Sequence, residues 1–318
     1  MIEGLPLADP APTGEAGLRA RILFQSNYLG EFEPCSCADN PVGGLPQGAA
    51  LLTDLRAASA VPVFSFDAGD RLFHHDLVAI SQEEAARRLK SVLLVDAGNL
   101  SGLDAGGIGG LDLGGGLPYL QKLAQRARYP LLSANLVDHD GAPLFQTAVL
   151  VKRGDLVVGV TSVLPGHLWM DEYETKDPYR AARAEVKALR AAGADLVVVL
   201  SNLGLDADRK LARVARADVI LGSRSREILP EAPKVGSTLI VHAGSRGRYL
   251  GDVRWYEGGV GRGPWLVGTT RAVLAAGRSD PTVRALVDAA LARLADPRLG
   301  VEPLRPGDPG HPGTEERR

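Results

Sequence analysis

One apolar run constrains most strongly how this chain can fold. Leu196-Val197-Val198-Val199-Leu200 contains no polar residue, and it lies between two helical patterns, Pro178 to Ala192 and Asp206 to Ala215. A strand that is apolar at every position must be covered on both faces, which is typical of a parallel sheet flanked by helices. The run therefore indicates an α/β protein whose sheet lies inside the molecule.

Other segments continue this alternation of strands and helices. Val92-Leu93-Leu94-Val95 resembles a strand on its own, but the helical pattern around it continues, so it is assigned to a helix. Segments 148–151 and 156–160 flank Gly154-Asp155 and predict a hairpin. Further strands are expected at 21–24, 61–66, 219–221, 238–241, 249–256 and 265–273, and further helices at 47–58, 82–99 and 281–294. The second half of the chain thus adds antiparallel strands.

The composition excludes several classes of protein. With 318 residues, 45% of them hydrophobic, the chain has ample material for a buried core. A net charge of −2 argues against a nucleic-acid-binding surface. No apolar run approaches the roughly 20 residues of a transmembrane helix. As written, the first residues lack a secretory signal, which predicts a cytoplasmic protein; a leader on the true N-terminus would instead imply the periplasm or cell envelope.

The chain divides into three expected parts. Residues 1–18 mix Pro, Gly and acids and are expected to be flexible, residues 19–300 form one globular domain, and residues 301–318 form a disordered Pro-rich tail. The domain carries only two cysteines, Cys35 and Cys37, and the whole chain has six histidines. These counts exclude a disulfide-built scaffold and a four-ligand zinc module.

Eight short stretches together resemble a known family. They occur in family order at residues 22–30, 43–55, 67–70, 102–116, 132–136, 193–204, 218–226 and 243–251. The ordered set resembles the calcineurin-like metallophosphoesterases, in the branch that contains the bacterial 5′-nucleotidases. The resemblance implies a four-layer α/β/β/α sandwich with its site at the carboxyl ends of the strands. It also implies two divalent metal ions, such as Mn, Zn or Fe, that activate a phosphate ester and a hydroxide.

The chain departs from the family at most of the metal-binding motifs. The family's Asp-x-His becomes Asn27-Tyr28-Leu29, its Gly-Asn-His-Glu/Asp falls near Gly109-Gly110-Leu111-Asp112, and its Leu-Ser-His becomes Leu200-Ser201-Asn202. The closing Gly-x-His-x-His becomes Gly222-Ser223-Arg224-Ser225-Arg226, whereas Gly69-Asp70 is kept, with Asp70 as the bridging carboxylate. The resemblance therefore marks as degenerate metal-site positions Asn27, Leu29, Asp70, Gly110, Asn202, Arg224 and Arg226.

These replacements predict a loss of metal chemistry. A guanidinium carries a permanent positive charge and cannot act as a metal ligand. The sequence therefore predicts a pseudoenzyme without a cofactor, which binds an unknown small anion or a protein partner. Residual metal-dependent hydrolysis of phosphate esters or nucleotides is the alternative. Arg224 and Arg226 would hold a phosphate, sulfate or carboxylate if they point into the cleft, or would pair with Asp70 and nearby acids.

A further hypothesis concerns the segment Glu33-Pro34-Cys35-Ser36-Cys37, which resembles an element of some nucleotidase-like proteins. Cys35 and Cys37, with His74 and His75, would bind a soft metal ion or carry out thiol chemistry. The alternative is a pair of structural cysteines. Two other polar residues have structural interpretations: His242 as a hydrogen-bonded, partly buried imidazole, and Asn135 as a side chain that bonds backbone groups.

Overall fold

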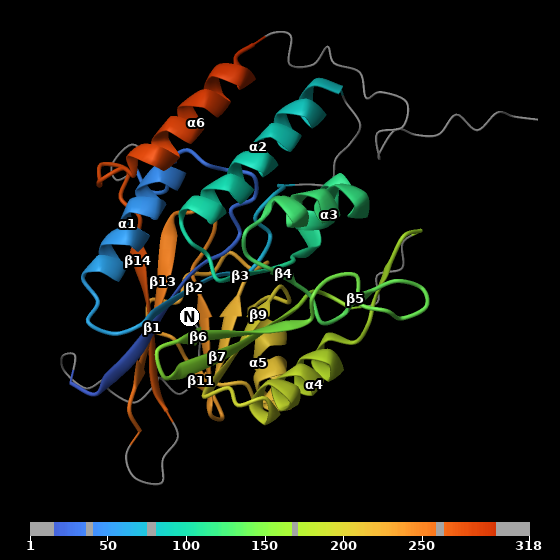
Figure 1. Cartoon of the computed structure of the whole chain (residues 1–318), viewed down its shortest axis with the longest axis vertical. Helices are drawn as coiled ribbons and strands as arrows, with labels where there is room; N and C mark the ends of the chain where they lie inside the picture. Colours follow the sequence, from blue (N-terminus) through green and yellow to red (C-terminus); the bar gives the residue numbers. More distant parts are fainter. Residues whose placement is uncertain (1–15, 36–40, 75–80, 167–170, 259–263, 297–318) are drawn as a thin grey trace, which may run out of the picture.

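The computed structural model describes residues 16–35, 41–74, 81–166, 171–258 and 264–296. Within these ranges the chain forms two six-stranded sheets, with helices on the outer face of each sheet (Figure 1). Segments 1–15 and 297–318, which include nearly all of the expected N-terminal segment and the whole expected tail, lie outside the described residues.

The first sheet has the strand order β14-β13-β1-β2-β3-β4. Strands β1 to β4 are parallel to one another, whereas β13 is antiparallel to β1 and β14 is antiparallel to β13. The bounds are β1 (Leu18–Gln25), β2 (Val63–Asp67), β3 (Ala105–Gly107), β4 (Leu131–Leu132), β13 (Tyr249–Tyr256) and β14 (Trp265–Ala272).

The second sheet has the strand order β11-β12-β10-β9-β7-β6. Its four central strands are parallel, and both edge strands pair antiparallel, with β6 and β7 forming the hairpin expected around Gly154. The bounds are β6 (Ala148–Arg153), β7 (Leu156–Val163), β9 (Leu196–Ser201), β10 (Val219–Gly222), β11 (Lys234–Val235) and β12 (Thr238–His242). Two short strands, β5 (Leu136–Val137) and β8 (Glu174–Thr175), pair outside the sheets.

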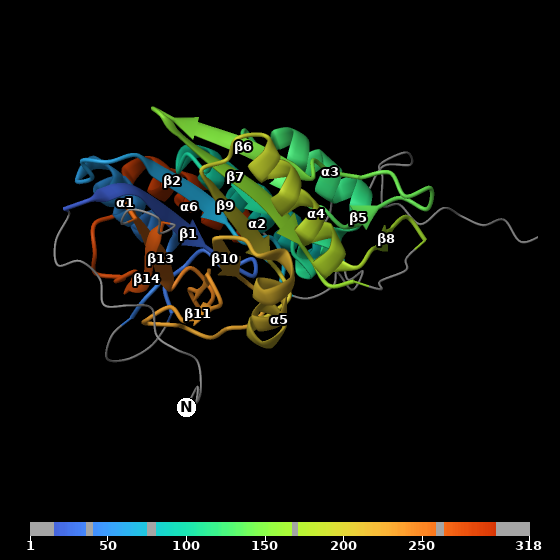
Figure 2. The same ribbon diagram turned by 90° about the horizontal axis from the view of Figure 1, so that it is seen from below.

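The helices cover the sheets from both sides. One side carries α1 (Leu45–Ala57), α2 (Ser81–Leu100), α3 (Leu117–Arg126) and α6 (Pro281–Leu294), and the other carries α4 (Pro178–Ala191) and α5 (Leu205–Ala215). In the view from below, α4 and α5 lie on the outer face of the second sheet (Figure 2). This arrangement confirms the predicted α/β class with four layers, α/β/β/α.

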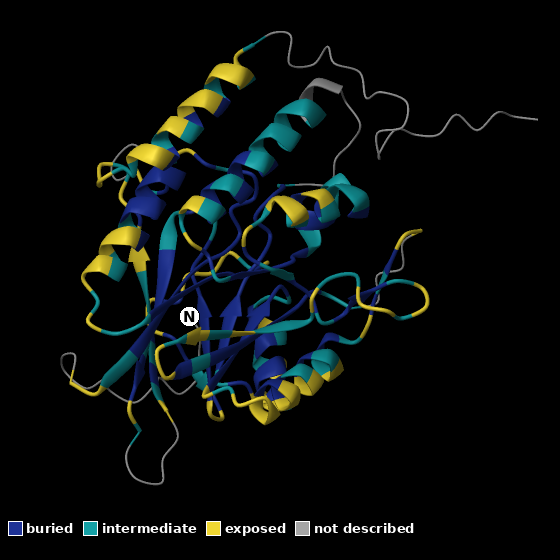
Figure 3. Cartoon of the chain, in the orientation of Figure 1, coloured by how far each residue is buried: buried dark blue, intermediate teal, exposed yellow. Residues whose placement is uncertain are grey.

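The apolar run of β9 lies at the centre of the sandwich, and all of its residues are buried (Figure 3). Leu196, Val198 and Leu200 pack in the core between the two sheets. Val197 and Val199 pack on the opposite face, in the core beneath α4 and α5. Alternate residues of one strand thus fill two different cores, which is why every position in the run is apolar.

Most expected elements are present. The run Val92–Val95 is part of α2, as its helical surroundings predict. Strand β3 and the 3₁₀ helix η1 (Gly110–Gly115) were not predicted, because their glycine-rich sequences lack the β-branched or periodic apolar residues that signal structure. Among the described residues, no helix has the length and apolar character needed to cross a membrane.

Candidate functional site

The predicted site residues lie where strands from both sheets end. Asn27 follows β1, Asp70 follows β2 and Gly110 follows β3 in the first sheet, while Asn202 follows β9 and Arg224 follows β10 in the second. Parallel strands place their carboxyl ends at one edge, and loops there commonly form sites in open α/β folds. We call these five residues the strand-end cluster.

The backbone at this edge adopts unusual conformations. Six non-glycine residues among those described have positive φ, and five of them lie in these loops, the sixth being Arg216 at the end of α5. Positive φ is uncommon outside glycine, and such residues gather at functional sites held by surrounding contacts. The five residues in the loops are Asn27, Leu29, Asp70, Arg224 and Arg246, with φ of 51°, 57°, 52°, 67° and 59°.

Asn27 uses its whole amide group to join three loops. Its Nδ2 donates to the carbonyl oxygens of Ser225, at 3.0 Å, and Gly244, at 2.9 Å. Its Oδ1 accepts the backbone N–H of Arg224 at 2.7 Å. Both carbonyl groups require a donor, which a carboxylate at this position would not supply. An amide at position 27 therefore fits its surroundings, and its oxygen already accepts one backbone N–H group.

Asp70 is buried and accepts the backbone N–H of Leu111 through Oδ1 at 2.9 Å. Burial raises the pKa of Asp70, while a hydrogen bond from Asn202, the Leu111 N–H and the charge of Arg224 act in the opposite direction. Its own backbone N–H donates to Asp112 Oδ2 at 3.0 Å. The Asp70 carboxylate thus accepts hydrogen bonds from Leu111 and Asn202 and lies within reach of the Arg224 charge.

Asp112 is a buried acid that the sequence interpretation did not single out. Its carboxylate accepts the backbone N–H groups of Asp70, Gly109 and Leu72, at 3.0, 2.8 and 2.8 Å. Burial, together with the charge of Asp70, raises its pKa to about 7, offset in part by these donors. Asp112 fastens the loop after β2 to the start of η1. In the sequence, the position of Asp112 at the end of the Gly-Gly-Leu-Asp motif was the one sign that it could belong to the site.

Asn202 connects the two sheets at the same edge. Its Oδ1 accepts the backbone N–H of Gly110, and its Nδ2 donates to Ser223 Oγ, both at 2.8 Å. Ser223 Oγ in turn donates to the carbonyl oxygen of Ala68 in the first sheet. As with Asn27, both ends of the amide at position 202 make structural hydrogen bonds.

The two arginines of the closing motif are exposed and point to different places. Arg224 Nη1 lies near Gly110, where an added Cβ would be 3.8 Å from it, and the charge of Arg224 acts on Asp70. Arg226 lines an open pocket with Arg246 and Arg248. Among the described residues, neither arginine forms an ion pair with a carboxylate. Of the two alternatives for these arginines, the described residues show no direct pairing with an acid, and only the charge of Arg224 acts on Asp70.

Behind this loop, a chain of buried hydrogen bonds joins Ser225, His242 and Asp208. Ser225 Oγ lies 3.0 Å from His242 Nδ1, and His242 Nε2 lies 2.8 Å from Asp208 Oδ2. Asp208, on α5, also accepts a hydrogen bond from Ser201 Oγ. Burial raises the pKa of Asp208, against the hydrogen bond and charge of His242. His242 is hydrogen-bonded as expected, although it is fully rather than partly buried.

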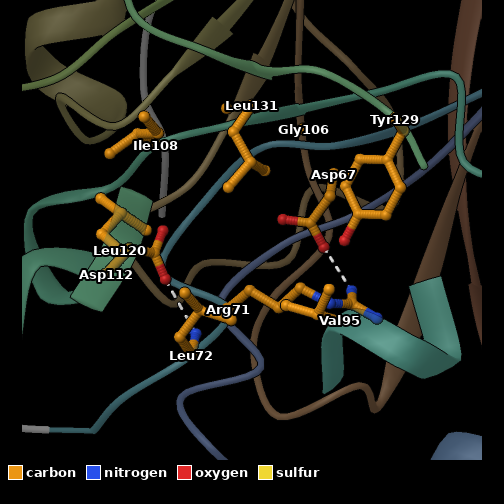
Figure 4. A pocket seen from close by; sticks show the side chains of 11 residues that line it. Asp67, Arg71, Leu72, Val95, Gly106, Ile108, Asp112, Leu120, Tyr129 and Leu131 are labelled. Carbon is orange, nitrogen blue, oxygen red and sulfur yellow. Dashed lines mark hydrogen bonds and ion pairs between the residues drawn. The ribbon is translucent and has the colours of Figure 1, made fainter. Parts of the chain in front are cut away.

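A second buried group supports the loop that carries Asp70. Asp67 accepts a hydrogen bond from Arg71 Nη1 at 2.6 Å, and Arg71 Nε donates to the carbonyl oxygen of Leu94 in α2. The pair borders a cavity of about 10 Å³, with Asp112 on its other side (Figure 4). That volume suits about one water molecule. The group therefore fixes the loop rather than binding a ligand.

The remaining predicted residues lie nearby or outside the described ranges. Leu29 is buried, and its backbone N–H donates to the Asp70 carbonyl oxygen at 3.0 Å. Cys35 Sγ accepts the N–H of Val42 at 3.4 Å, and His74 Nε2 lies 3.4 Å from Arg246 Nη2. Cys37 and His75 lie outside the described residues, so the thiol or metal hypothesis stays a prediction. Asn135 bonds backbone groups at Leu164 and Lys176, as expected.

The family's two metal ions can be compared with the donors present. Among the described residues there is no group of three or more His, Cys, Asp or Glu side chains that could hold a metal ion. The amide oxygens of Asn27 and Asn202 and Oδ1 of Asp70 each accept a backbone N–H group. With Arg224 adding a fixed positive charge beside them, these side chains do not fit a pair of divalent cations.

The sequence is similar to several known proteins. No protein-family model matches the chain. It is 21% identical to a 2′,3′-cyclic-nucleotide 2′-phosphodiesterase/3′-nucleotidase of Haemophilus influenzae, over 86% of this chain and 49% of that protein. Another relative, an apyrase of Anopheles gambiae, is 32% identical over 36% of this chain and 22% of its own length. The chain thus spans half the length of these curated relatives or less.

Solved structures match over most of the chain. A 5′-nucleotidase precursor from Thermus thermophilus superposes with a TM-score of 0.72 at 24% identity, covering 86% of this chain and 58% of that one. The calcineurin-like phosphoesterase YfkN of Bacillus subtilis gives a TM-score of 0.73 at 18% identity, covering 87% of this chain and 98% of that one. The resemblance indicated by the motifs is confirmed: the chain has the fold of the calcineurin-like phosphoesterases and 5′-nucleotidases.

Proposed function

We propose that this chain is a pseudoenzyme of the phosphoesterase fold, which does not hydrolyse phosphate esters and binds a small anion with its arginine-bearing loop. One observation carries the proposal: the side-chain oxygens at the strand ends accept backbone N–H groups, in Asn27, Asp70 and Asn202. Two of these oxygens belong to neutral amides, and the third lies within reach of the fixed positive charge of Arg224, a donor set that disfavours divalent cations. The relatives' hydrolytic activities therefore do not extend to this chain.

The arginines support the anion-binding half of the proposal. The guanidinium of Arg224 lies near Gly110, and Arg226 lines a neighbouring pocket. Guanidinium groups without a carboxylate partner retain their full charge for a ligand and can form bidentate hydrogen bonds to an oxyanion. Positive charge at the strand ends takes the place of the two metal ions that the family resemblance implies.

Hydrolysis assays test the first half directly. The full chain would be incubated with a 5′-nucleoside monophosphate and a 2′,3′-cyclic nucleotide, with and without added Mn²⁺, and its bound metal measured. We expect no turnover above background, no stoichiometric metal, and the same result for Asp70→Ala. Metal-dependent turnover that Asp70→Ala abolishes would overturn the proposal.

Thermal unfolding tests the second half. Inorganic phosphate at constant ionic strength should raise the unfolding temperature of the wild-type chain, because an anion that binds only the folded state stabilises it. Arg224→Gln or Arg226→Gln should reduce this shift. Arg213→Gln, which removes the same charge on α5, should leave it unchanged. Equal shifts in all four proteins would count against a site at the loop.

A further inference from the structure

Beside the strand-end cluster lies an open pocket of about 460 Å³ that brings together three arginines. Arg226 comes from the loop after β10, and Arg246 and Arg248 come from the loop between β12 and β13. Val42, Ile228 and Tyr249 supply the apolar part of the lining. The lining contains no Asp or Glu among the described residues. We call this the arginine pocket.

The backbone holds the three arginines in a fixed arrangement. The N–H of Arg246 donates to the carbonyl oxygen of Asn27 at 2.6 Å, with Arg246 at a φ of 59°. The carbonyl oxygen of Arg248 accepts the N–H of Val273 at 2.9 Å. Glu227, the residue after Arg226, is held by a hydrogen bond from the N–H of Gly244 to its carbonyl oxygen at 3.0 Å. The pocket is therefore largely preformed, which lowers the entropic cost of binding.

The charges in the pocket are not neutralised by protein carboxylates. No ion pair joins Arg226, Arg246 or Arg248 to an acid among the described residues, and Arg246 Nη2 has His74 Nε2 at 3.4 Å. By contrast, the buried Arg21 and Arg71 each pair with an aspartate. Three like charges gathered in one open pocket repel one another, and an anionic ligand would relieve this repulsion.

We infer that the arginine pocket binds an organic phosphate monoester, with its dianionic phosphate against the three arginines and an apolar, ring-bearing group against Val42, Ile228 and Tyr249. The inference rests on the proposed anion-binding role and names its ligand class. A phosphate monoester carries nearly two negative charges at neutral pH, so three guanidinium groups favour it over a monoanionic sulfate ester. The apolar lining favours an organic ester over inorganic phosphate.

Calorimetric titration of the full chain with phenyl phosphate, phenyl sulfate and inorganic phosphate tests this inference. At constant ionic strength and pH about 7.5, phenyl phosphate should bind about tenfold more tightly than each of the other two. Arg246→Gln and Arg248→Gln should each weaken binding of phenyl phosphate by about tenfold or more, the usual effect of losing a charged hydrogen bond. Both side chains are partly exposed, so the variants should fold, and circular dichroism would verify this.

A matched control removes charge elsewhere. Arg213 lies in a second basic pocket, between α4 and α5, and Arg213→Gln should leave phenyl phosphate binding unchanged. Absence of phenyl phosphate binding, or weakening by Arg213→Gln equal to that by Arg246→Gln, would overturn the inference. Binding lost in Arg224→Gln but retained in Arg246→Gln and Arg248→Gln would also overturn it, while leaving an anion site at the loop. Failure of the proposed pseudoenzyme role would appear separately, as phenol release that Asp70→Ala abolishes.

Discussion

The backbone N–H of Arg224 donates to Asn27 Oδ1 at 2.7 Å, joining residues that lie 197 positions apart in the chain. The same amide donates through Nδ2 to Ser225 and Gly244. Asn27 is thus the point where the loop after β1 of the first sheet holds the arginine loop after β10 of the second. The geometry requires one acceptor and two donors in one side chain, which only an amide of this length provides.

Replacing this amide by the family's carboxylate should therefore harm the protein. In Asn27→Asp, two carbonyl oxygens lose their donor and face a buried negative charge, so we expect the free energy of unfolding to fall by about 3 kcal/mol. Denaturant unfolding measures this. Asn99→Asp is the matched control, because Asn99 also bonds two backbone groups but at an exposed position, and it should cost less than about 1 kcal/mol. Equal costs would contradict the role given to Asn27.

The pKa of Asp112 gives a second prediction. Burial and the charge of Asp70 raise it to about 7, whereas the ordinary value is 3.8. Between these values the folded chain binds a proton that the unfolded chain releases, so the free energy of unfolding should fall as pH rises from about 4 to about 7, by up to about 1.4 kcal/mol per pH unit. Above about pH 7 the carboxyl is ionised in both states, and this contribution to the slope should vanish.

Asp70→Asn should lower the pKa of Asp112, because it removes the second cause of the shift. Carbon NMR titration of the Asp112 carboxyl group measures the change, and the slope of stability against pH should become smaller between pH 5 and 7. Asp206→Asn removes a carboxylate from the exposed side of α5 and serves as the control. If the titration midpoint of the Asp112 carboxyl group moves equally in both variants, or in neither, the charge of Asp70 does not raise the pKa of Asp112.

The layered core was predictable because periodicity reports burial directly. Leu196 to Leu200 are apolar at each position since they face two cores, and the sequence displays this without any knowledge of partners. Strand β3, Ala105-Gly106-Gly107, was not predictable in the same way. Glycine has no side chain to reveal a face, and here an added Cβ at Gly107 would lie 2.6 Å from Ser162 Oγ in the opposite sheet. Close approach of the sheets, not strand propensity, selects glycine there.

The site was predictable only where a motif marked it. Asn27, Asp70 and Asn202 were found through their places in the family's motifs, and the structure brings them together with Arg224. Arg246 and Arg248 lie in the family-like stretch 243–251, but nothing in it marked them as site residues, because only the fold brings their loop beside Arg226. The link between His242 and Asp208 also depends on contacts 34 residues apart, between a strand and a helix.

The hydrogen bond between His242 and Asp208 supplies a third prediction. His242 and Asp208 are both fully buried and 2.8 Å apart, so removing one leaves the other without its partner. We expect His242→Leu and Asp208→Leu each to lower the free energy of unfolding by about 3 kcal/mol or more. The double variant should cost less than the sum of the two, by about 2 kcal/mol, in a double-mutant cycle measured by urea unfolding. Strict additivity would show that the pair is not coupled.

Two neighbouring glycines allow a sharp test of how closely the loops pack at the strand ends. A Cβ added at Gly109 would lie 2.2 Å from Asp70 Oδ1 and 2.4 Å from the Asp70 backbone nitrogen, so something in the Asp70 loop would have to shift. A Cβ added at Gly110 would lie 3.7 Å from Asn202 Oδ1 and 3.8 Å from Arg224 Nη1, which is ordinary contact. Gly109→Ala should therefore lower the free energy of unfolding by about 2 kcal/mol or more, whereas Gly110→Ala should change it by less than about 0.5 kcal/mol. Urea unfolding of both variants measures the difference.

NMR titration of the Asp112 carboxyl group gives a second test. The pKa of Asp112 should change in Gly109→Ala but not in Gly110→Ala, because only Gly109→Ala disturbs the hydrogen bonds that Asp112 accepts from Gly109 and Asp70. Similar stability of the two variants would mean that the Asp70 loop shifts at little cost, and would contradict close packing of the loops at the strand ends.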